Sequence, residues 1–241
     1  PHIGLATVTF HYEGALRHKD NLGNALVIRP GAVNWMTAGR GICHSERTPD
    51  EERKNGQSMH GILTCVALPK DYAEIAPDFV HHPADTLPEF DLGGAHARVL
   101  AGDAFGHSSP VEFPWGIWYV GADADSGADF TVGAEEAEDR ALYVAFGEAV
   151  IDGELIEAGQ MAIFTPGKDI PVSVAAGTRF MLAGGQPMDG PRKIEWNFVA
   201  TDTDRLEQAK TDWRASAAGG WTDTPFTLPD GEDEYIPLPG D

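Results

Sequence analysis

Basic residues are scarce in this sequence. Only 17 lysines and arginines stand against 38 aspartates and glutamates, which gives a formal net charge of −21. A surface this acidic repels nucleic acid and anionic membranes over most of its area. Long apolar runs are also lacking, because Gly, Pro or a charged residue interrupts each one well before the ~18 residues of a membrane-spanning helix. We therefore expect no direct nucleic-acid binding and no membrane span.

Cysteine is equally rare, with Cys43 and Cys65 as the only two. Two cysteines cannot build a disulfide framework, and they are more simply interpreted as reduced thiols of a cytoplasmic protein. The composition otherwise suits a folded chain, since 42% of the 241 residues are hydrophobic and can fill a sizeable core.

Histidine is absent from the second half of the chain. All nine histidines fall within the first 107 residues: His2, His11, His18, His44, His60, His81, His82, His96 and His107. If the protein holds a transition metal through nitrogen or sulfur ligands, the first half must supply them.

Short β-rich runs separated by Gly, Asn, Asp and Pro predict an all-β fold of sandwich or barrel type. We expect one set of strands at 5–12, 15–18 and 25–28. A second set is expected at 111–120, 141–151, 161–164, 171–174 and 179–183. The polar segment 69–94 between the two sets is interpreted as a connector.

The two sets of strands show a weak internal sequence similarity. Residues 12–16 resemble 146–150, and residues 41–44 occupy the place that 167–170 take in the second set. This pattern suggests a duplicated β-barrel in which Ile170 stands where the first copy has His44. Two unrelated hairpins that share turn residues remain the alternative.

One helix is expected near the C-terminus, at about 204–216. Asp204 can cap it with Glu207 three residues later, and Leu206, Ala209 and Trp213 follow helical spacing. The Pro-rich, acidic stretch 222–241 is expected to be an extended tail.

The strongest local candidate for chemistry is the pair His44 and Glu46. On a strand, two residues at this spacing project from one face, so an imidazole and a carboxylate can bind one divalent metal. Taken alone, a His and a Glu at this spacing more commonly form a hydrogen-bonded pair on the protein surface.

Other candidates are assigned to structure rather than to metal. His11 and His18 lie in the first hairpin, where His18 fits a polar turn with Asp20. His60 is a core or supporting residue, and Cys43 is expected to pack. The neighbours His81 and His82 are interpreted as part of a solvated loop.

Several segments of the first 46 residues are distinctive: PHIGLATVTFHYEG at 1–14, HKDNLG at 18–23, IRPG at 28–31, WMTAGRG at 35–41 and HSE at 44–46. Later segments are HGI at 60–62, VALP at 66–69, GGQP at 184–187 and WNFV at 196–199. On these segments the sequence resembles the pirin family, densely across 1–46 and more loosely across 70–180.

The resemblance implies a fold and a division into domains. Pirins are two-domain members of the cupin superfamily, which implies two jelly-roll (double-stranded β-helix) barrels face to face. The N-terminal barrel over 1–110 would carry the metal. A metal-free C-terminal barrel over 111–241 would include the helix and the tail.

The resemblance also implies a ligand set for one mononuclear metal. Pirins use two histidines of a His-Pro-His motif and the His and Glu of a Gly-x-x-His-x-Glu segment. Here His2, His44 and Glu46 match three of these ligands. The fourth would precede Pro1, so we expect the printed sequence to be trimmed from a longer chain. Fe(II) is favoured, with Mn, Ni, Co, Cu or Zn as alternatives.

Two functions follow from the resemblance. The first is a quercetin 2,3-dioxygenase-like oxidoreductase that acts on a small flavonol-like aromatic substrate with O₂, with Glu46 as the catalytic proton acceptor. The alternative is a non-catalytic iron or redox sensor that regulates transcription or metabolism through a protein partner. A cupin with an unrelated small-molecule substrate is the third possibility.

Overall fold

The protein forms two compact units. The computed structural model describes residues 1–241, of which 1–84 and 188–241 make the first unit and 85–187 the second. The expected boundary after residue 110 differs from this division. The last segment of the chain belongs to the first unit because Phe198, Leu206 and Trp213 pack in one apolar cluster with Ile3 and Cys43.

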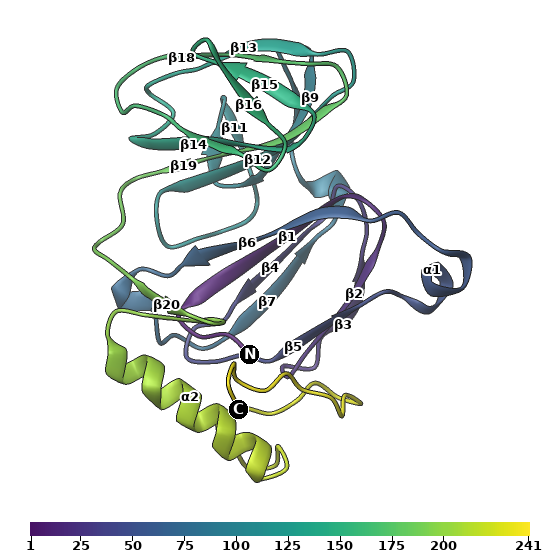
Figure 1. The fold of residues 1–241 in the computed structure, drawn as a ribbon, viewed down its shortest axis with the longest axis vertical. Helices are drawn as coiled ribbons and strands as arrows, with labels where there is room; N and C mark the ends of the chain where they lie inside the picture. Colours follow the sequence, from purple (N-terminus) through teal and green to yellow (C-terminus); the bar gives the residue numbers. More distant parts are fainter. The chain divides into compact units, whose positions relative to one another are not determined.

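Two antiparallel sheets form the body of the first unit (Figure 1). One has the strand order β6-β1-β4-β7 and the other the order β3-β2-β5. Their strands are β1 (Leu5–Glu13), β2 (Leu16–Asp20), β3 (Ala25–Ile28), β4 (Val33–Thr37), β5 (His44–Arg47), β6 (His60–Ala67) and β7 (Asp78–His82). The unit also contains a short hairpin of β20 (Lys193–Glu195) and β21 (Phe198–Ala200).

The segment expected to be a connector contains two strands. In the first unit, β7 pairs with β4, while β8 (Glu89–Leu92) pairs with β9 (Ala95–Ala101) in the second. The short turns η1 (Lys70–Tyr72) and η2 (Ala84–Thr86) lie in the same segment. The boundary between the units therefore falls inside this segment. The two strands were not predicted because the composition of the segment is polar.

The predicted C-terminal helix is α2 (Thr203–Ala218). Its N-cap is Asp202 rather than Asp204: the Asp202 carboxylate accepts a hydrogen bond of 2.8 Å from the backbone N–H of Arg205. Leu206, Ala209 and Trp213 are buried, as their spacing predicts. A short helix that was not predicted, α1 (Asp50–Asn55), buries no residue. Neither helix is long and apolar enough to cross a bilayer.

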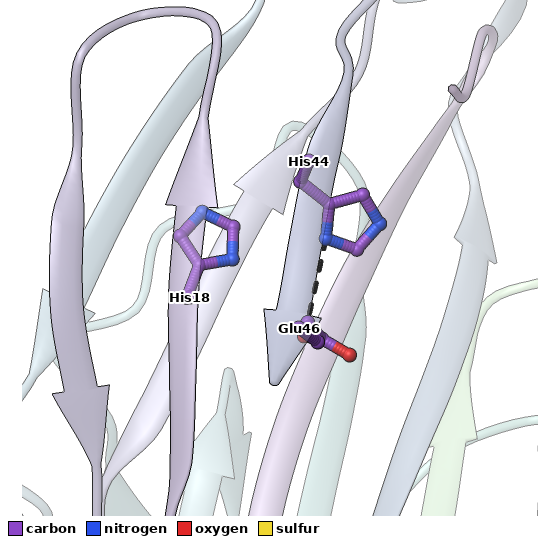
Figure 2. Close-up of side chains that lie close together, drawn as sticks. All are labelled: His18, His44 and Glu46. Carbon is purple, nitrogen blue, oxygen red and sulfur yellow. Dashed lines mark ion pairs between the residues drawn. The ribbon is translucent and has the colours of Figure 1, made fainter. Parts of the chain in front are cut away.

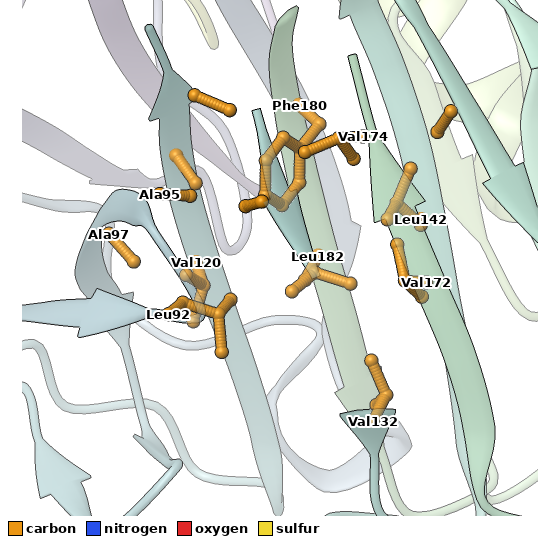
Figure 3. Packing of buried hydrophobic residues seen from close by; sticks show 14 of the residues in the cluster. Leu92, Ala95, Ala97, Val120, Val132, Leu142, Val172, Val174, Phe180 and Leu182 are labelled. Carbon is orange, nitrogen blue, oxygen red and sulfur yellow. The ribbon is translucent and has the colours of Figure 1, made fainter. Parts of the chain in front are cut away.

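The second unit is built of two larger antiparallel sheets around an apolar core. Their strand orders are β17-β14-β19-β12-β9-β8 and β13-β18-β15-β16, beside a small β10–β11 ribbon. The further strands are β10 (Asp103–Ala104), β11 (His107–Ser108), β12 (Ile117–Ala124), β13 (Ala128–Val132), β14 (Asp139–Phe146), β15 (Glu148–Ile151), β16 (Glu154–Glu157), β17 (Met161–Ile163), β18 (Ile170–Val174) and β19 (Thr178–Gly185). Figure 3 shows side chains such as Leu142, Phe180 and Leu182, which are fully buried in this core.

Strand pairing supports the internal repeat. In the first unit β1 pairs with β4 and β6, while β2 pairs with β3 and β5. In the second unit β14 pairs with β17 and β19, while β15 pairs with β16 and β18. The six strands β1–β6 and the six strands β14–β19 thus follow the same pairing order, and β5 corresponds to β18.

Candidate metal centre

Strand β5 carries two of the predicted ligands. The chain reaches it through a tight turn in which Gly39 has φ +50°, and a Cβ at this position would lie 2.1 Å from the carbonyl oxygen of Ile75. Only glycine fits such a position. Along β5, His44 and Glu46 project to the same side, with Nδ1 of His44 3.9 Å from Oε1 of Glu46 (Figure 2).

His2 completes the predicted set. An isolated β-bridge joins it to Ile42, and its backbone N–H donates to the Ile42 carbonyl at 2.8 Å. This bridge brings the His2 ring next to the first residue of β5. Nε2 of His2 then lies 3.0 Å from Nε2 of His44. The structure therefore brings together His2, His44 and Glu46, the three residues that the sequence analysis gave as metal ligands.

His18 is a fourth member that the sequence analysis did not assign to the site. It lies in β2 directly opposite Glu46 in the β2–β5 register, and the donor atoms of His18, His44 and Glu46 all lie within 4.8 Å of one another (Figure 2). The expected contact with Asp20 is present, with His18 Nε2 3.0 Å from Asp20 Oδ2. However, His18 is in a strand rather than a turn, and its ring stacks on Phe79 at 4.3 Å.

Asp20 fixes the orientation of His18. The Asp20 carboxylate is buried and also accepts hydrogen bonds from the backbone N–H groups of Leu22 and Asn24, at 2.9 and 3.1 Å. Burial opposes ionisation, but the hydrogen bonds from His18 and Asn24 outweigh it and lower the pKa of Asp20. A carboxylate that orients an imidazole in this way is a common support for metal-ligating histidines.

Burial keeps the imidazoles of His2 and His44 neutral. It lowers the pKa of His2 to about 3 and the pKa of His44 well below its ordinary value, because the charged imidazolium loses its hydration. Burial likewise raises the pKa of Glu46, to which Thr9 Oγ1 donates a hydrogen bond at 3.5 Å. Neutral rings have free lone pairs, which is the protonation state that metal binding requires.

Unpartnered ring nitrogens indicate that the cluster fits a cation. The Nδ1 atoms of His2 and His44 are buried without a hydrogen-bond partner, while the two Nε2 atoms face each other. Buried nitrogen atoms of this kind are costly unless something satisfies them. Imidazole and carboxylate donors together suit a borderline divalent ion of the first transition row. The residues present therefore fit the metal that the resemblance implied.

The remaining histidines lie outside this cluster. His11 is buried, and His60 begins β6 with its ring 5.3 Å from that of Tyr12. The prediction of a solvated loop was wrong for His81, which lies in β7 with Nδ1 2.7 Å from Oδ1 of Asn34. Cys43 packs as expected, and burial raises its pKa to about 11, which keeps the thiol protonated.

A cavity of about 510 Å³ opens beside the cluster. Its lining includes the donors His2, His44 and Glu46, together with Trp213 of α2 and residues of the C-terminal tail. A volume of this size lies within the range of small-molecule sites, ~300–1,000 Å³.

Comparison with known proteins identifies the family. The Pirin family model matches residues 1–64, and the model of the pirin C-terminal cupin domain matches residues 119–219. A pirin-like protein from Caulobacter vibrioides is 46% identical over 243 residues, which span 99% of this chain and 80% of that protein. The chain belongs to the pirin family.

Solved structures agree with this assignment. A quercetin 2,3-dioxygenase from Acinetobacter baumannii is 32% identical to this pirin, with a TM-score of 0.87 over 99% of this chain and 76% of that chain. The bacterial pirin YhhW from Escherichia coli, solved in complex with nickel(II), is 20% identical with a TM-score of 0.59, over 78% of this chain and 74% of that chain. The second match demonstrates a shared cupin fold.

Proposed function

We propose that this pirin is a metal-dependent dioxygenase of flavonol-like substrates, with one mononuclear divalent ion in the first unit. The observation that carries the proposal is the position of the His2, His44 and Glu46 donors on one wall of a cavity of ligand size. The likeness to a quercetin 2,3-dioxygenase over nearly the whole chain supports the substrate class.

Each residue of the cluster has a distinct role in this proposal. His2, His44 and Glu46 hold the ion, for which Fe(II) is our first candidate, and His18 stands beside them in the orientation set by Asp20. When bound, the metal supplies Lewis acidity toward a substrate hydroxyl and redox chemistry toward O₂.

Glu46 is the proposed proton acceptor. Its carboxylate lines the cavity, and its contact with Thr9 holds it at the wall, within reach of a hydroxyl group that enters. The loss of hydration that raises its pKa also makes the carboxylate a stronger base than one in water.

The test is metal loading under anaerobic conditions followed by addition of quercetin and O₂. We expect loss of the flavonol absorbance and release of carbon monoxide, both dependent on the metal and both absent in His44→Ala. His60→Gln is the control, because His60 lies outside the cluster. Failure of the loaded wild type to consume quercetin would refute the dioxygenase proposal.

The same preparation tests the regulatory alternative. A pull-down with the reduced and the oxidised metal form would capture different partners if the protein is a redox sensor. Identical partners in both states would count against a redox switch.

A further inference from the structure

Part of the lining of the cavity comes from the C-terminal tail. Residues 226–238 have no helix or strand, yet both ends are buried in the first unit, with Phe226 and Leu238 at 4% and 3% exposure. In Figure 1 this tail, in yellow, runs beside β5. Between its two buried ends the chain lines the cavity through Leu228, Pro229 and Ile236. We refer to residues 226–238 as the strap.

Hydrogen bonds hold the strap to β5, the strand that carries His44 and Glu46. Side chains alternate along β5, so Ser45 and Arg47 project to the other face of the strand, but all four residues line the cavity. Ser45 Oγ donates to Glu232 Oε1 at 3.0 Å, and Arg47 donates to Glu232 Oε2 at 2.7 Å. Glu232 therefore joins the strap to the strand that presents both β5 donors.

A second ionic contact provides a natural control. Arg47 also donates to Glu234 Oε2 at 2.9 Å. The two carboxylates differ in exposure, however, since the Glu232 side chain is 9% exposed and that of Glu234 is 74% exposed. Exposed ion pairs contribute little, whereas a buried carboxylate that loses its partner is costly.

The strap presents apolar surface that no protein group covers. Tyr235 and Ile236 both line the cavity and remain 47% and 69% exposed. The carbonyl of Ile236 accepts a hydrogen bond of 3.1 Å from Nε1 of Trp213. The Tyr235 ring meets those of Trp221 and Trp213 edge-on, at 4.9 and 6.1 Å. The Tyr235 ring is thus held in place, with a large part of its surface free.

We propose that the strap selects the ligand of the metal cavity: Tyr235 packs against a flat aromatic ligand whose oxygen atoms face the metal donors, and Glu232 is the positioning residue that keeps this wall in place. The chemistry of the cavity lining carries the inference. Its imidazole and carboxylate donors match an oxygenated edge of a ligand, and its fixed aromatic ring with an aliphatic neighbour matches an apolar ring system. The ligand class rests on the proposed function.

The experiment measures binding rather than turnover. The full chain is loaded with Ni(II) and titrated anaerobically with 4-nitrocatechol and with quercetin, whose absorbance changes on binding. We expect Tyr235→Leu to weaken both probes about tenfold, because it keeps an apolar side chain but removes the flat ring. Tyr235→Phe should bind both probes like the wild type, and Ni(II) affinity should be equal in all three proteins.

Glu232 is tested against its exposed neighbour. Glu232→Gln should weaken probe binding at least fivefold and make the strap more susceptible to limited proteolysis. Glu234→Gln should change neither property. Thermal unfolding of each variant reports whether the rest of the first unit is intact, and a folded Glu232→Gln protein with unchanged binding and proteolysis would refute its positioning role.

The outcomes separate this inference from the dioxygenase proposal. If wild type binds quercetin but does not consume it under O₂, the dioxygenase proposal fails and the strap proposal stands. If Tyr235→Leu binds both probes like the wild type, or if the metal-loaded wild type binds neither, the strap proposal is overturned.

Discussion

The two repeats place very different residues at the same positions. Strands β5 and β18 correspond in pairing order, and each begins at the compared residue, His44 in the first unit and Ile170 in the second. Two residues later, Glu46 corresponds to Val172. Opposite these, in matching register on the neighbouring strands, His18 corresponds to Ile151. Three potential donors in one barrel are therefore three aliphatic residues in the other.

The difference extends to the whole interior of each unit. Ile151, Ile170 and Val172 belong to the apolar core of the second unit, where the one buried charged residue is Arg140. Its guanidinium donates to backbone carbonyls such as those of Gly133 and Lys168. Among the buried side-chain atoms without a hydrogen-bond partner, Nε of Arg140 lies in the second unit, and the others, including Nδ1 of His44, lie in the first. The first unit thus retains costly polar groups that a bound ion can satisfy.

The largest expected effect comes from giving the first unit the residues of the second. We expect the triple variant His18→Ile, His44→Ile, Glu46→Val to lose bound metal completely, as measured by elemental analysis after loading and desalting. The double variant His44→Ile, Glu46→Val keeps the buried His18–Asp20 pair. In its metal-free form it should be more stable than metal-free wild type by about 1–4 kcal/mol in urea denaturation, because aliphatic groups replace buried polar ones. A variant that still retained metal would show that the donors lie elsewhere.

The reverse change places a carboxylate in the second unit. Val172→Glu should lower the free energy of unfolding by about 3–5 kcal/mol, because it places a carboxylate among the apolar side chains that surround Val172. Ser173→Glu is the matched control, since its side chain is exposed on the same strand and should cost little. Metal content of the first unit should be unchanged in both. Equal stability of the two variants would contradict the contrast between the interiors.

Arg140 offers a smaller test of the second unit. Arg140→Met should cost about 2 kcal/mol, because carbonyl groups in two loops lose their buried donor. Hydrogen exchange measured across residues 85–187 would show which strands and loops lose stability in Arg140→Met. Arg179→Met serves as the control, because the Arg179–Asp123 ion pair is partly exposed and should contribute less than about 1 kcal/mol.

The smallest effect is on pH dependence. His2 and His44 have lowered pKa values in the folded protein, so the unfolded chain binds more protons below its histidine pKa of about 6.5. Stability of the metal-free protein should therefore fall as pH decreases below about 6.5, with a slope of up to ~1.4 kcal/mol per pH unit for each histidine.

The raised pKa of Glu46 acts in the opposite direction over part of this range and reduces the net slope. Urea denaturation at several pH values in the presence of a chelator measures the slope. His44→Gln should have a flatter profile than wild type, and an unchanged profile would contradict the assignment of His44 as a buried neutral ring.

Local patterns allowed part of the site to be predicted. The spacing of His44 and Glu46 already places them on one face of a strand, and the resemblance added His2. His18 could not be recognised in this way, because its proximity to Glu46 depends on the β2–β5 register, which joins residues distant in sequence. The same limit applied to β7, whose partner β4 lies far upstream.

Long-range packing also explains the differences in domain organisation. The expected division followed sequence order, whereas the fold returns to its first unit after residue 187. Only the burial of residues such as Phe198 and Trp213 against Ile3 reveals this return. The tail was predicted as extended, but the role of Glu232 depends on its contact with Arg47, which no local pattern contains.

This return of the chain has a consequence for biosynthesis. The second unit is continuous in sequence, so all of its strands are synthesised before α2 and the strap. Ile3 and Cys43, by contrast, lack their apolar cover until residues 198–238 have been synthesised. The β-strands that carry the donors are synthesised first, yet their cavity gains its outer wall last. The part of the cavity lining that the strap supplies can therefore form only after residues 226–238 have been synthesised.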